Sequence, residues 1–321
     1  MYDLIGDIHG HATELKALLA KMDYQEVDRV WQHPERKVIF LGDFVDGGPE
    51  QVETVEIARK MVQRGNALAV MGNHEFNAVA WATEDPENPE HHLRRHTDKN
   101  LNQHKEFLAQ VGAKGCIFYH NVIEWFKTLP VYLDLPKFRV VHACWHPEYV
   151  TAINKYTDSE NRLLPEAWEQ ASRKGSEAYE AIETLLKGLE IPLPHPHHFT
   201  DKYGHKRTDI RTKWWQQGEL TYRDLAMVPG DAIDQIPHEP VASHILPGYD
   251  GEKLVFVGHY WMKGEPAPLS DKIACLDYSV AGTHGGNLCA YRFCGETTLC
   301  SDGFTWVAGP YRTVKGEDLS H

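Results

Sequence analysis

The sequence predicts an α/β fold whose first third is built from parallel strands. Three short apolar runs, at 2–5, 37–41 and 67–71, each stop at a glycine followed by a polar residue, as buried strands do. The two segments between these runs carry apolar residues at helical spacing. Strands that alternate with helices in this order favour parallel pairing with right-handed crossovers.

Apolar residues at helical spacing mark each of the two helices. In the first helix they are Leu15, Leu18, Leu19 and Met22. In the second helix they are Val52, Val55, Ala58 and Val62. Pro49 precedes the second set and suits the first turn of a helix. Both segments therefore predict amphipathic helices.

The remainder of the chain alternates between polar stretches and further apolar runs. Residues 84–114 are polar and rich in histidine, which indicates an excursion over the surface. Further strands are expected at 139–142, 253–257, 272–278 and 287–293. The chain thus returns to β character after its middle third.

That middle third, at about 151–240, has a different composition. Residues 166–189 show helical periodicity, whereas 191–198 are rich in proline and histidine and cannot form a regular helix. We therefore expect one domain over residues 1–321, with a partly helical insertion or cap at about 151–240.

Composition narrows the class of protein. Of the 321 residues, 42% are hydrophobic and 25% are charged, a balance typical of a globular protein. The net charge of −13 opposes general binding to nucleic acid. It does not exclude a phosphorylated substrate, because bound divalent cations reverse the local field.

Cysteine usage and hydropathy predict the compartment. The six cysteines form no CxxC pair, so a disulfide scaffold is not expected. Met1 is followed almost at once by the apolar run at 2–5, which leaves no room for a signal peptide, and no apolar stretch has membrane-spanning length. We expect a cytoplasmic protein without a membrane partner.

Five short motifs fall at the ends of apolar runs or just after them. They are GDIHG at 6–10, GDFVDGGP at 42–49, GNHE at 72–75, VHA at 141–143 and VGH at 257–259. Ligands in open α/β sheets gather at the carboxyl ends of strands. If these segments are neighbouring strands, one crevice holds Asp7, His9, Asp43, Asn73, His142 and His259.

These side chains suit a pair of divalent metal ions. Carboxylate oxygens and imidazole nitrogens bind first-row divalent ions, and a carboxylate such as Asp43 can offer one oxygen to each of two ions. The first ion would take Asp7, His9 and Asp43. The second would take Asp43, Asn73, His142 and His259. Two ions roughly 3.5–4 Å apart could clamp a phosphate and hold an activated hydroxide for in-line attack. Mn²⁺ is the expected ion, with Fe or Zn as alternatives.

His74 has a different expected role. It directly follows a presumed ligand and should point into the same crevice, where an imidazole can protonate a leaving oxygen. Asp46 could orient His74 and raise its pKa. The alternative for Asp46 is to cap the helix that begins near Pro49, and the alternative for His74 is to be only a neighbour of Asn73.

Taken together in this order, the five motifs resemble those of the calcineurin-like metallophosphoesterases. The similarity is greatest to the phosphoprotein phosphatase branch, which includes bacterial serine/threonine phosphatases and diadenosine tetraphosphatases. It covers about 1–77, thinly 131–146, and again 254–293. The resemblance implies two mixed β-sheets packed as a sandwich with helices outside, an α/β/β/α arrangement, and the ligand roles given above.

One position departs from the family pattern. The second motif of the family normally reads GDxVDRG, and its Arg grips the substrate phosphate, whereas this chain has Gly47. A glycine offers no bidentate clamp. Either another Arg reaches the site, or phosphate affinity is lower, or the substrate differs. Arg207 and Arg211 are the first candidates, and Arg94 and Arg95 the second.

Several functions are compatible with a two-metal site of this kind. The leading one is a phosphomonoesterase that acts on a phosphoprotein or a small phosphorylated metabolite, and the alternative is a dinucleoside polyphosphate hydrolase. A bacterial RNA end-repair phosphatase ranks lower because the chain is acidic and has no kinase or ligase module. A non-catalytic metal-binding scaffold has only the loss of the Arg at position 47 in its favour, and the presence of both Asp46 and His74 opposes it.

Overall fold

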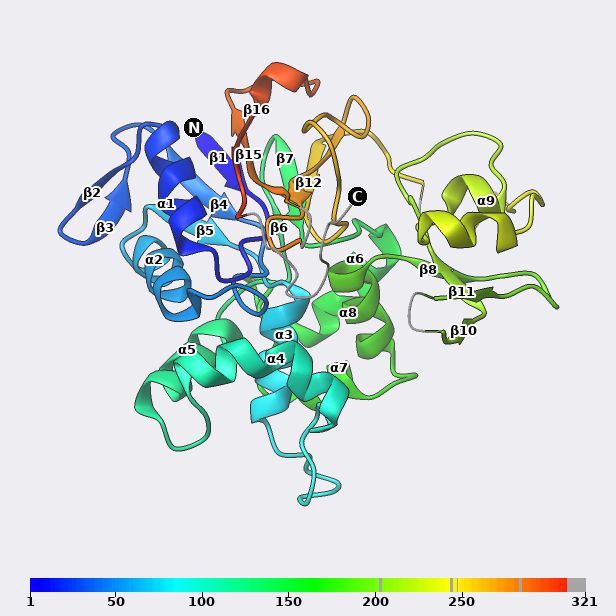
Figure 1. The fold of residues 1–321 in the computed structure, drawn as a ribbon, viewed down its shortest axis with the longest axis horizontal. Helices are drawn as coiled ribbons and strands as arrows, with labels where there is room; N and C mark the ends of the chain where they lie inside the picture. Colours follow the sequence, from blue (N-terminus) through cyan, green and yellow to red (C-terminus); the bar gives the residue numbers. More distant parts are fainter. Residues whose placement is uncertain (202–203, 243–244, 247, 283–284, 311–321) are drawn as a thin grey trace, which may run out of the picture.

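Two β-sheets form the centre of the molecule (Figure 1). The computed structural model describes residues 1–310 apart from 202–203, 243–244, 247 and 283–284. The six-stranded sheet has the order β14 (Asp277–Tyr278), β15 (Asn287–Phe293), β1 (Tyr2–Ile5), β4 (Lys37–Phe40) and β5 (Ala67–Ala69), with β16 (Phe304–Ala308) paired to β15. The four-stranded sheet has the order β13 (Ile273–Cys275), β12 (Leu254–Val257), β7 (Phe138–Val141) and β6 (Tyr132–Asp134).

Both sheets are mixed. β1, β4 and β5 pair in parallel, as their alternation with helices predicts, while β15 pairs antiparallel with β1. In the second sheet β12 is parallel to both β7 and β13, and β6 is antiparallel to β7. The carboxyl ends of β1, β4, β5, β7 and β12 therefore carry the five motifs.

The sheets pack face to face through alternate side chains of their strands. In β4, Ile39 lies in the apolar core shared with Val140 and Phe256 of the other sheet, whereas Val38 and Phe40 face the core formed with the helices. The rings of Phe138 and Phe293 meet across the sheets at 4.8 Å. This confirms the sandwich of two mixed sheets flanked by helices.

Helices cover the outer faces (Figure 1). α1 (Ala12–Lys21) and α2 (Gln51–Gln63) pack on the six-stranded sheet, and α3 (Asn73–Ala82) packs on α5 (Ile117–Lys127). On the other side α6 (Pro147–Ile153), α7 (Ala167–Ser172) and α8 (Glu177–Lys187) pack together. None of the helices that the structure describes has both the length and the apolar character needed to cross a membrane.

Three sequence expectations need correction. The segment 84–114 is not only a surface excursion, because it contains α4 (Asp98–Val111), whose Phe107 is fully buried. The periodic stretch 166–189 is two helices, α7 and α8. The apolar run 272–278 divides between β13 and β14, which belong to different sheets. The hairpin of β2 (Gln25–Val27) and β3 (Val30–Gln32), and strand β16, had no predicted counterpart.

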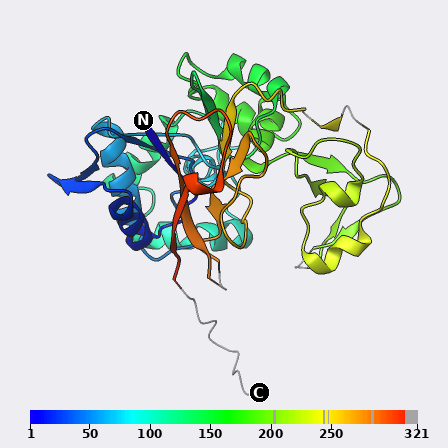
Figure 2. The same cartoon turned by 90° about the horizontal axis from the view of Figure 1, so that it is seen from above.

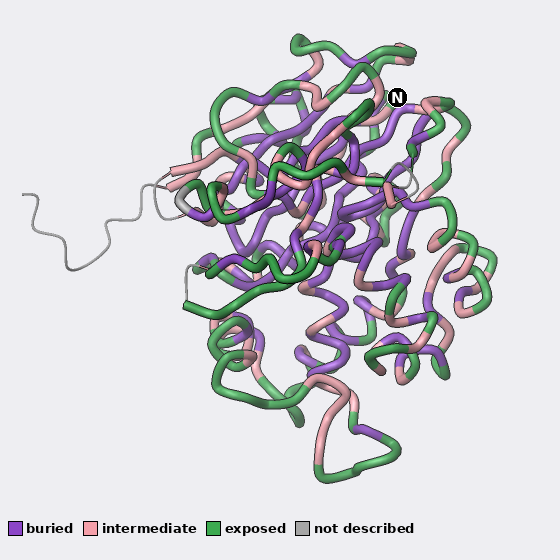
Figure 3. Tube along the Cα trace, turned by 90° about the vertical axis from the view of Figure 1, so that its right-hand side faces the viewer, coloured by how far each residue is buried: buried purple, intermediate pink, exposed green. Residues whose placement is uncertain are grey.

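Residues 190–240, which we call the arm, stand to one side of the body (Figures 1 and 2). The arm consists of β8 (Glu190–Pro192) paired with β11 (Asp209–Arg211), β9 (Phe199–Thr200) paired with β10 (Lys206–Arg207), and the short helix α9 (Tyr222–Leu225). About half of its described residues are exposed, and Figure 3 shows exposed chain around the periphery of the molecule and buried chain at its centre. Trp214 anchors it, because its buried indole Nε1 donates to the Tyr260 hydroxyl at 3.0 Å.

Candidate metal centre and catalytic site

The predicted ligands converge at one end of the sandwich. Each follows a strand end or opens a helix: Asp7 and His9 follow β1, Asp43 follows β4, Asn73 opens α3, His142 follows β7, and His259 follows β12. All are buried except His259, which is partly buried. The topology thus brings all six predicted ligands together, as expected from parallel strands whose carboxyl ends share an edge.

Asp43 lies at the centre of the cluster. Its Oδ2 atom is 3.2 Å from His142 Nε2 and 3.8 Å from His9 Nε2. Asp43 and His142 form one three-residue group with His259, and Asp43 and His9 form another with His74; within each group the candidate ligand atoms lie within 4.8 Å of one another. Asp43 belongs to both groups, as a carboxylate that bridges two metal ions must.

The group of Asp43 and His9 contains His74 as its third member, whereas the sequence predicts Asp7 in that place. We favour Asp7 as the ligand, because its Oδ2 is 3.9 Å from His9 Nε2 while its buried Oδ1 has no hydrogen-bond partner among the described residues. His74 is already engaged, since its Nδ1 lies 2.6 Å from Asp46 Oδ2. The role of each ligand stays a prediction.

Asn73 lies between His142 and His259, the two histidines of the other group. Its Oδ1 lies 2.8 Å from His259 Nδ1 and 3.1 Å from His142 Nε2. An amide oxygen this close to both imidazoles is compatible with a shared ion, because Asn73, His142 and His259 are all predicted to bind the second ion.

Unpartnered buried atoms show that these residues fit divalent metal ions. Asp7 Oδ1, His9 Nε2 and His259 Nε2 are buried without a hydrogen-bond partner among the described residues. Such atoms are costly to bury unless something binds them. All are oxygen or imidazole nitrogen, the donors that first-row divalent ions accept. The metal centre that the resemblance of the motifs implies is therefore in agreement with this donor set.

Charge within the cluster is consistent with this fit. Burial and the carboxylate of Asp277 raise the pKa of Asp7 well above its ordinary value. Burial lowers the pKa of His259, which favours the neutral imidazole that binds metal. Although burial opposes it, the imidazoles of His142 and His74 hold the pKa of Asp43 well below its ordinary value. A bound cation would offset the repulsion between buried carboxylates that lie so close together.

The glycines of the motifs leave room for this crowding. A Cβ atom at Gly72 would lie 2.2 Å from Asp43 Oδ1, and one at Gly258 would lie 2.0 Å from Asp7 Oδ1. The ligands His9 and Asp43 have positive φ angles of 49° and 50°. Backbone strain of this kind is typical of functional sites, and Asp and His tolerate it better than most residues.

Glu75, the last residue of the GNHE motif, holds the loops in place. Its fully buried carboxylate accepts hydrogen bonds from the backbone amides of Asp43 and Phe44, both at 2.8 Å, and of Gly72 at 3.0 Å. Burial and the nearby Asp43 raise the pKa of Glu75 to about 7. Glu75 thus holds Asp43 in position relative to α3, a role that is not predicted in the sequence analysis.

His74, Asp46 and His104 form a linked triad beside the metal cluster. Asp46 Oδ2 lies 2.6 Å from His74 Nδ1, and Asp46 Oδ1 lies 2.9 Å from His104 Nδ1. Although burial opposes ionisation, the hydrogen bonds with His104 and His74 lower the pKa of Asp46 to about 2. Although burial lowers it, Asp43 and the bond to Asp46 raise the pKa of His74 to about 9.

The exposure of these residues separates their roles. The side chain of His74 is 22% exposed, whereas those of Asp46 and His104 are 6% and 5% exposed. His74 can therefore reach a substrate, while Asp46 and His104 support it from behind. Sequence reasoning did not find His104, and its only local signal is that it shares a helical face with the buried Phe107 and Val111.

A cavity of about 380 Å³ opens at this centre. Its walls include His9, His74, Gly47, Gln103 and the half-exposed Trp261, whose ring lies 5.7 Å from that of His9. Trp261 has a φ angle of 49°, and its backbone amide donates to Asp277 at 2.7 Å. One wall of this cavity is therefore a half-exposed indole whose backbone is held by Asp277.

Of the four candidate arginines, Arg94 shares a recess with His74. It lines a small recess shared with Asp46, Asn73, His74 and His104. Its guanidinium donates to Asn77 Oδ1 and Gln103 Oε1, both at 2.7 Å, and burial lowers its pKa. These bonds use two of the five guanidinium N–H groups.

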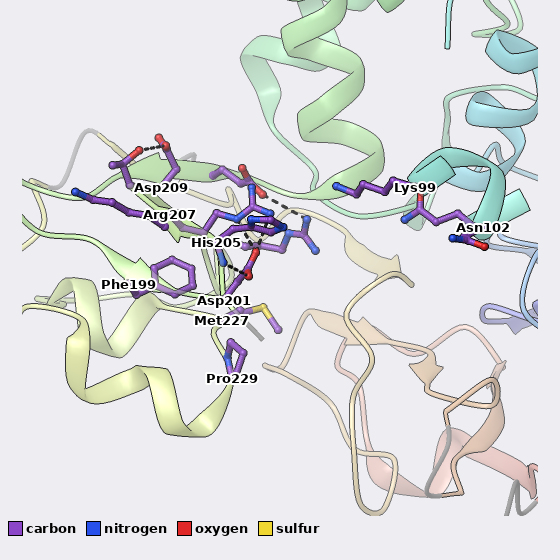
Figure 4. Close-up of a pocket in the computed structure, with 14 residues that line it drawn as sticks. Lys99, Asn102, Phe199, Asp201, His205, Arg207, Asp209, Met227 and Pro229 are labelled. Carbon is purple, nitrogen blue, oxygen red and sulfur yellow. Dashed lines mark hydrogen bonds and ion pairs between the residues drawn. The ribbon is translucent and has the colours of Figure 1, made fainter. Parts of the chain in front are cut away.

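The two arginines predicted first lie elsewhere. Arg207 and Arg211 line a separate cavity between the arm and α4 (Figure 4), where they pair with Asp201 and Glu190. Arg211 is still close enough to the centre to lower the pKa of His259, after the larger effect of burial.

Comparison with known proteins defines the class. Residues 2–173 match the family model of the calcineurin-like phosphoesterases, more than half of the chain. The chain therefore belongs to the calcineurin-like phosphoesterase family, as its motifs predict. Divalent metal ions are implied by that membership, in agreement with the donor set.

Individual relatives share only parts of the chain. An asymmetrical bis(5'-nucleosyl)-tetraphosphatase of Oceanobacillus iheyensis is 30% identical over 142 residues, which is 44% of this chain and 54% of the relative. A symmetrical bis(5'-nucleosyl)-tetraphosphatase of Hamiltonella defensa is 39% identical over 194 residues, 59% of this chain and 53% of the relative. The chain spans about half of the length of these curated relatives.

Among solved structures, a serine/threonine phosphatase of Saccharomyces cerevisiae is 14% identical, with a TM-score of 0.46 over 99% of this chain and 81% of that one. A cold-active protein-tyrosine phosphatase from a Shewanella species is 15% identical, with a TM-score of 0.47 over 96% and 79%.

Proposed function

We propose that this chain hydrolyses phosphate monoesters, of a phosphoprotein or a small phosphorylated metabolite, at the centre around Asp43. The observation that carries the proposal is His74, which is partly exposed and held by Asp46 directly beside a cluster of metal-type donors. A non-catalytic scaffold would not need this arrangement, because His74 and Asp46 are not among the six predicted metal ligands.

The residues divide the chemistry between them. Asp7, His9, Asp43, Asn73, His142 and His259 would hold two divalent ions. When bound, such ions neutralise phosphoryl charge and lower the pKa of water. His74 would donate its Nε2 proton to the leaving oxygen, because its Nδ1 is occupied by Asp46. His104 keeps Asp46 in place from the other side. Mn²⁺ is the proposed ion, with Fe or Zn as alternatives.

Metal removal and restoration test this function. Chelator-treated protein should release p-nitrophenol from p-nitrophenyl phosphate at least roughly 100-fold more slowly than protein given Mn²⁺, because two-metal sites contribute several kcal/mol to the transition state. Bound metal is measured in parallel. Equal rates with and without metal would contradict a metal-dependent reaction, and two bound ions without turnover on any phosphate ester would favour the scaffold.

A dinucleoside polyphosphate hydrolase is the second candidate. Two observations favour it. The relatives named above carry that activity in their names, and the separate cavity of about 1060 Å³ between the arm and α4 shares Asn102 and Gln103 with the lining of the cavity at the centre. Turnover of diadenosine tetraphosphate compared with p-nitrophenyl phosphate, at matched metal, distinguishes the two candidates.

We further propose that Arg94 takes over the phosphate grip that Gly47 cannot provide. In Arg94→Ala, KM for p-nitrophenyl phosphate and the inhibition constant of inorganic phosphate should both rise roughly 10- to 100-fold, the range for a lost hydrogen bond to a charged group. Arg95→Ala, at an exposed neighbour, is the matched control. Unchanged constants in Arg94→Ala would return the role to Arg207 or Arg211.

A further inference from the structure

One large apolar side chain is exposed in the wall of the catalytic cavity. Trp261 is 47% exposed, and it is one of five large apolar residues that are exposed in the described part of the chain. Of these five, Trp261 is the one that lines the cavity with His9 and His74. An indole in water forgoes the free energy that its burial would supply. Trp261 therefore offers an apolar surface that a ligand can cover.

The backbone around Trp261 holds this indole in position. Its φ angle of 49° lies in a region that bulky residues rarely adopt. The amide of Trp261 donates to Asp277 Oδ2 at 2.7 Å, and the amide of Met262 donates to the carbonyl oxygen of Asp277 at 2.9 Å. The hydroxyl of Ser279 donates to the carbonyl oxygen of Met262 at 3.0 Å. Backbone strain that several hydrogen bonds maintain is typical of functional positions.

Small residues leave open the space beside His9. Gly47 has no side chain, and a Cβ atom there would lie 3.6 Å from Ala281 Cβ and 3.9 Å from His9 Cβ, which are ordinary contact distances. Gly47, Ala281 and Trp261 line the same cavity, and we call these three residues the Trp261 slot. The rings of His9 and His74 are 4.9 Å apart, so the Trp261 slot adjoins the predicted proton donor.

The Trp261 slot suits a flat aromatic ring. The indole of Trp261 is inclined by 33° to the imidazole of His9, with 5.7 Å between ring centroids, a distance at which aromatic rings attract one another. The cavity volume of about 380 Å³ is in the range of small-molecule sites. An alkyl group would gain only apolar contact with the indole, whereas an aromatic ring would also gain from stacking.

We propose that this cavity selects aryl phosphate monoesters, whose aromatic ring stacks on Trp261 while the phosphate lies at the centre around Asp43. The inference rests on the proposed function and deepens it, because it names the group that is esterified to the reacting phosphate. The ring occupies the Trp261 slot, and the phenolic oxygen faces His74. A tyrosine side chain of a phosphoprotein and a small phenolic metabolite share this chemistry.

Free phosphotyrosine and free phosphoserine are the substrates that test the Trp261 slot. In Trp261→Leu, the ratio of kcat/KM for phosphotyrosine to kcat/KM for phosphoserine should fall at least about threefold from its wild-type value, as expected for a lost aromatic pair. Comparing ratios removes the greater intrinsic reactivity of the phenolic ester. Trp261→Phe should restore most of the ratio. Trp31→Leu, at a partly buried tryptophan of β3, is the matched control and should keep the wild-type ratio. An unchanged ratio in Trp261→Leu would overturn the proposal.

A phosphotyrosyl peptide distinguishes the two sources of the aryl group. A kcat/KM at least about tenfold higher for the peptide than for free phosphotyrosine would assign the slot to a phosphoprotein. Equal values would assign it to a small phenolic phosphate. In both cases the value for the preferred substrate should fall in Trp261→Leu, and its failure to fall would count against stacking on Trp261.

A binding measurement separates failure of this proposal from failure of the proposed function. Benzylphosphonate and propylphosphonate cannot be hydrolysed, and they carry an aryl and an alkyl group on the same phosphonate. Titrated calorimetrically into Mn²⁺-loaded protein, benzylphosphonate should bind more tightly, and the ratio of the two affinities should fall at least about threefold in Trp261→Leu at unchanged metal content. Absence of turnover on any monoester in wild type would overturn the proposed function, and the phosphonates would still test the slot. Equal affinities of the two phosphonates for wild type would overturn the slot even if monoesters are hydrolysed.

Discussion

Asp43→Asn is expected to reduce turnover roughly a thousandfold or more and to leave at most one metal ion bound. The reason is that Asp43 is the only carboxylate common to both groups of ligand atoms among the described residues. An amide has nearly the same size but no negative charge, so the substitution removes the bridge without emptying space. A loss of several kcal/mol of charge stabilisation corresponds to this reduction in rate. Elemental analysis of purified protein and turnover of p-nitrophenyl phosphate measure the two effects.

The chain offers a closely matched control for this substitution. Asp28 is exposed and has a φ angle of 52°, against 50° for Asp43. Asparagine tolerates the left-handed region as well as aspartate does. Asp28→Asn should therefore keep both turnover and metal content. Two ions and normal turnover in Asp43→Asn would show that the centre is not organised around Asp43.

The parts of the fold that could be predicted are those with a strong local pattern. Strands β1, β4 and β5 are short apolar runs that end at glycine, and the helices between them have one apolar face, so their order and parallel pairing follow. The run 272–278 shows what local pattern misses. It reads as one strand, but the carboxylate of Asp277 accepts hydrogen bonds from the amides of Trp261 and Ser279, and the chain passes from one sheet to the other there.

In the candidate site, too, the residues that could be predicted are those marked by a local sequence pattern. Residues in the motifs, such as Asp43 and His74, could be identified because glycines and strand ends mark them in the sequence. His104 and Arg94 lie in the polar, histidine-rich segment 84–114, where nothing local separates them from surface residues. Only the packing of α4 brings His104 to 2.9 Å from Asp46. Arg207 and Arg211 likewise cannot be placed from the sequence, because no local pattern shows where the arm lies relative to α4.

His74→Asn is expected to lower kcat by roughly two or more orders of magnitude while both metal ions remain bound, because loss of a general acid typically costs that much. The side chain sits 3.8 Å from Asp43 and is not one of the predicted ligands, so metal content should stay unchanged. His120→Asn, at an exposed position on α5, is the matched control and should have wild-type kcat.

The leaving group distinguishes proton donation by His74 from other roles. A p-nitrophenolate ion leaves without help far more readily than an alkoxide, so it depends less on a proton from His74. The fall in kcat of His74→Asn should therefore be at least about tenfold larger for an alkyl phosphate than for p-nitrophenyl phosphate, in line with the dependence of general acid catalysis on the strength of the reacting group. His104→Gln should show the same dependence with a smaller fall, because it loosens Asp46 but leaves His74 in place. Equal falls for the two substrates in His74→Asn would mean that His74 positions the phosphate and that the leaving oxygen receives its proton from another group.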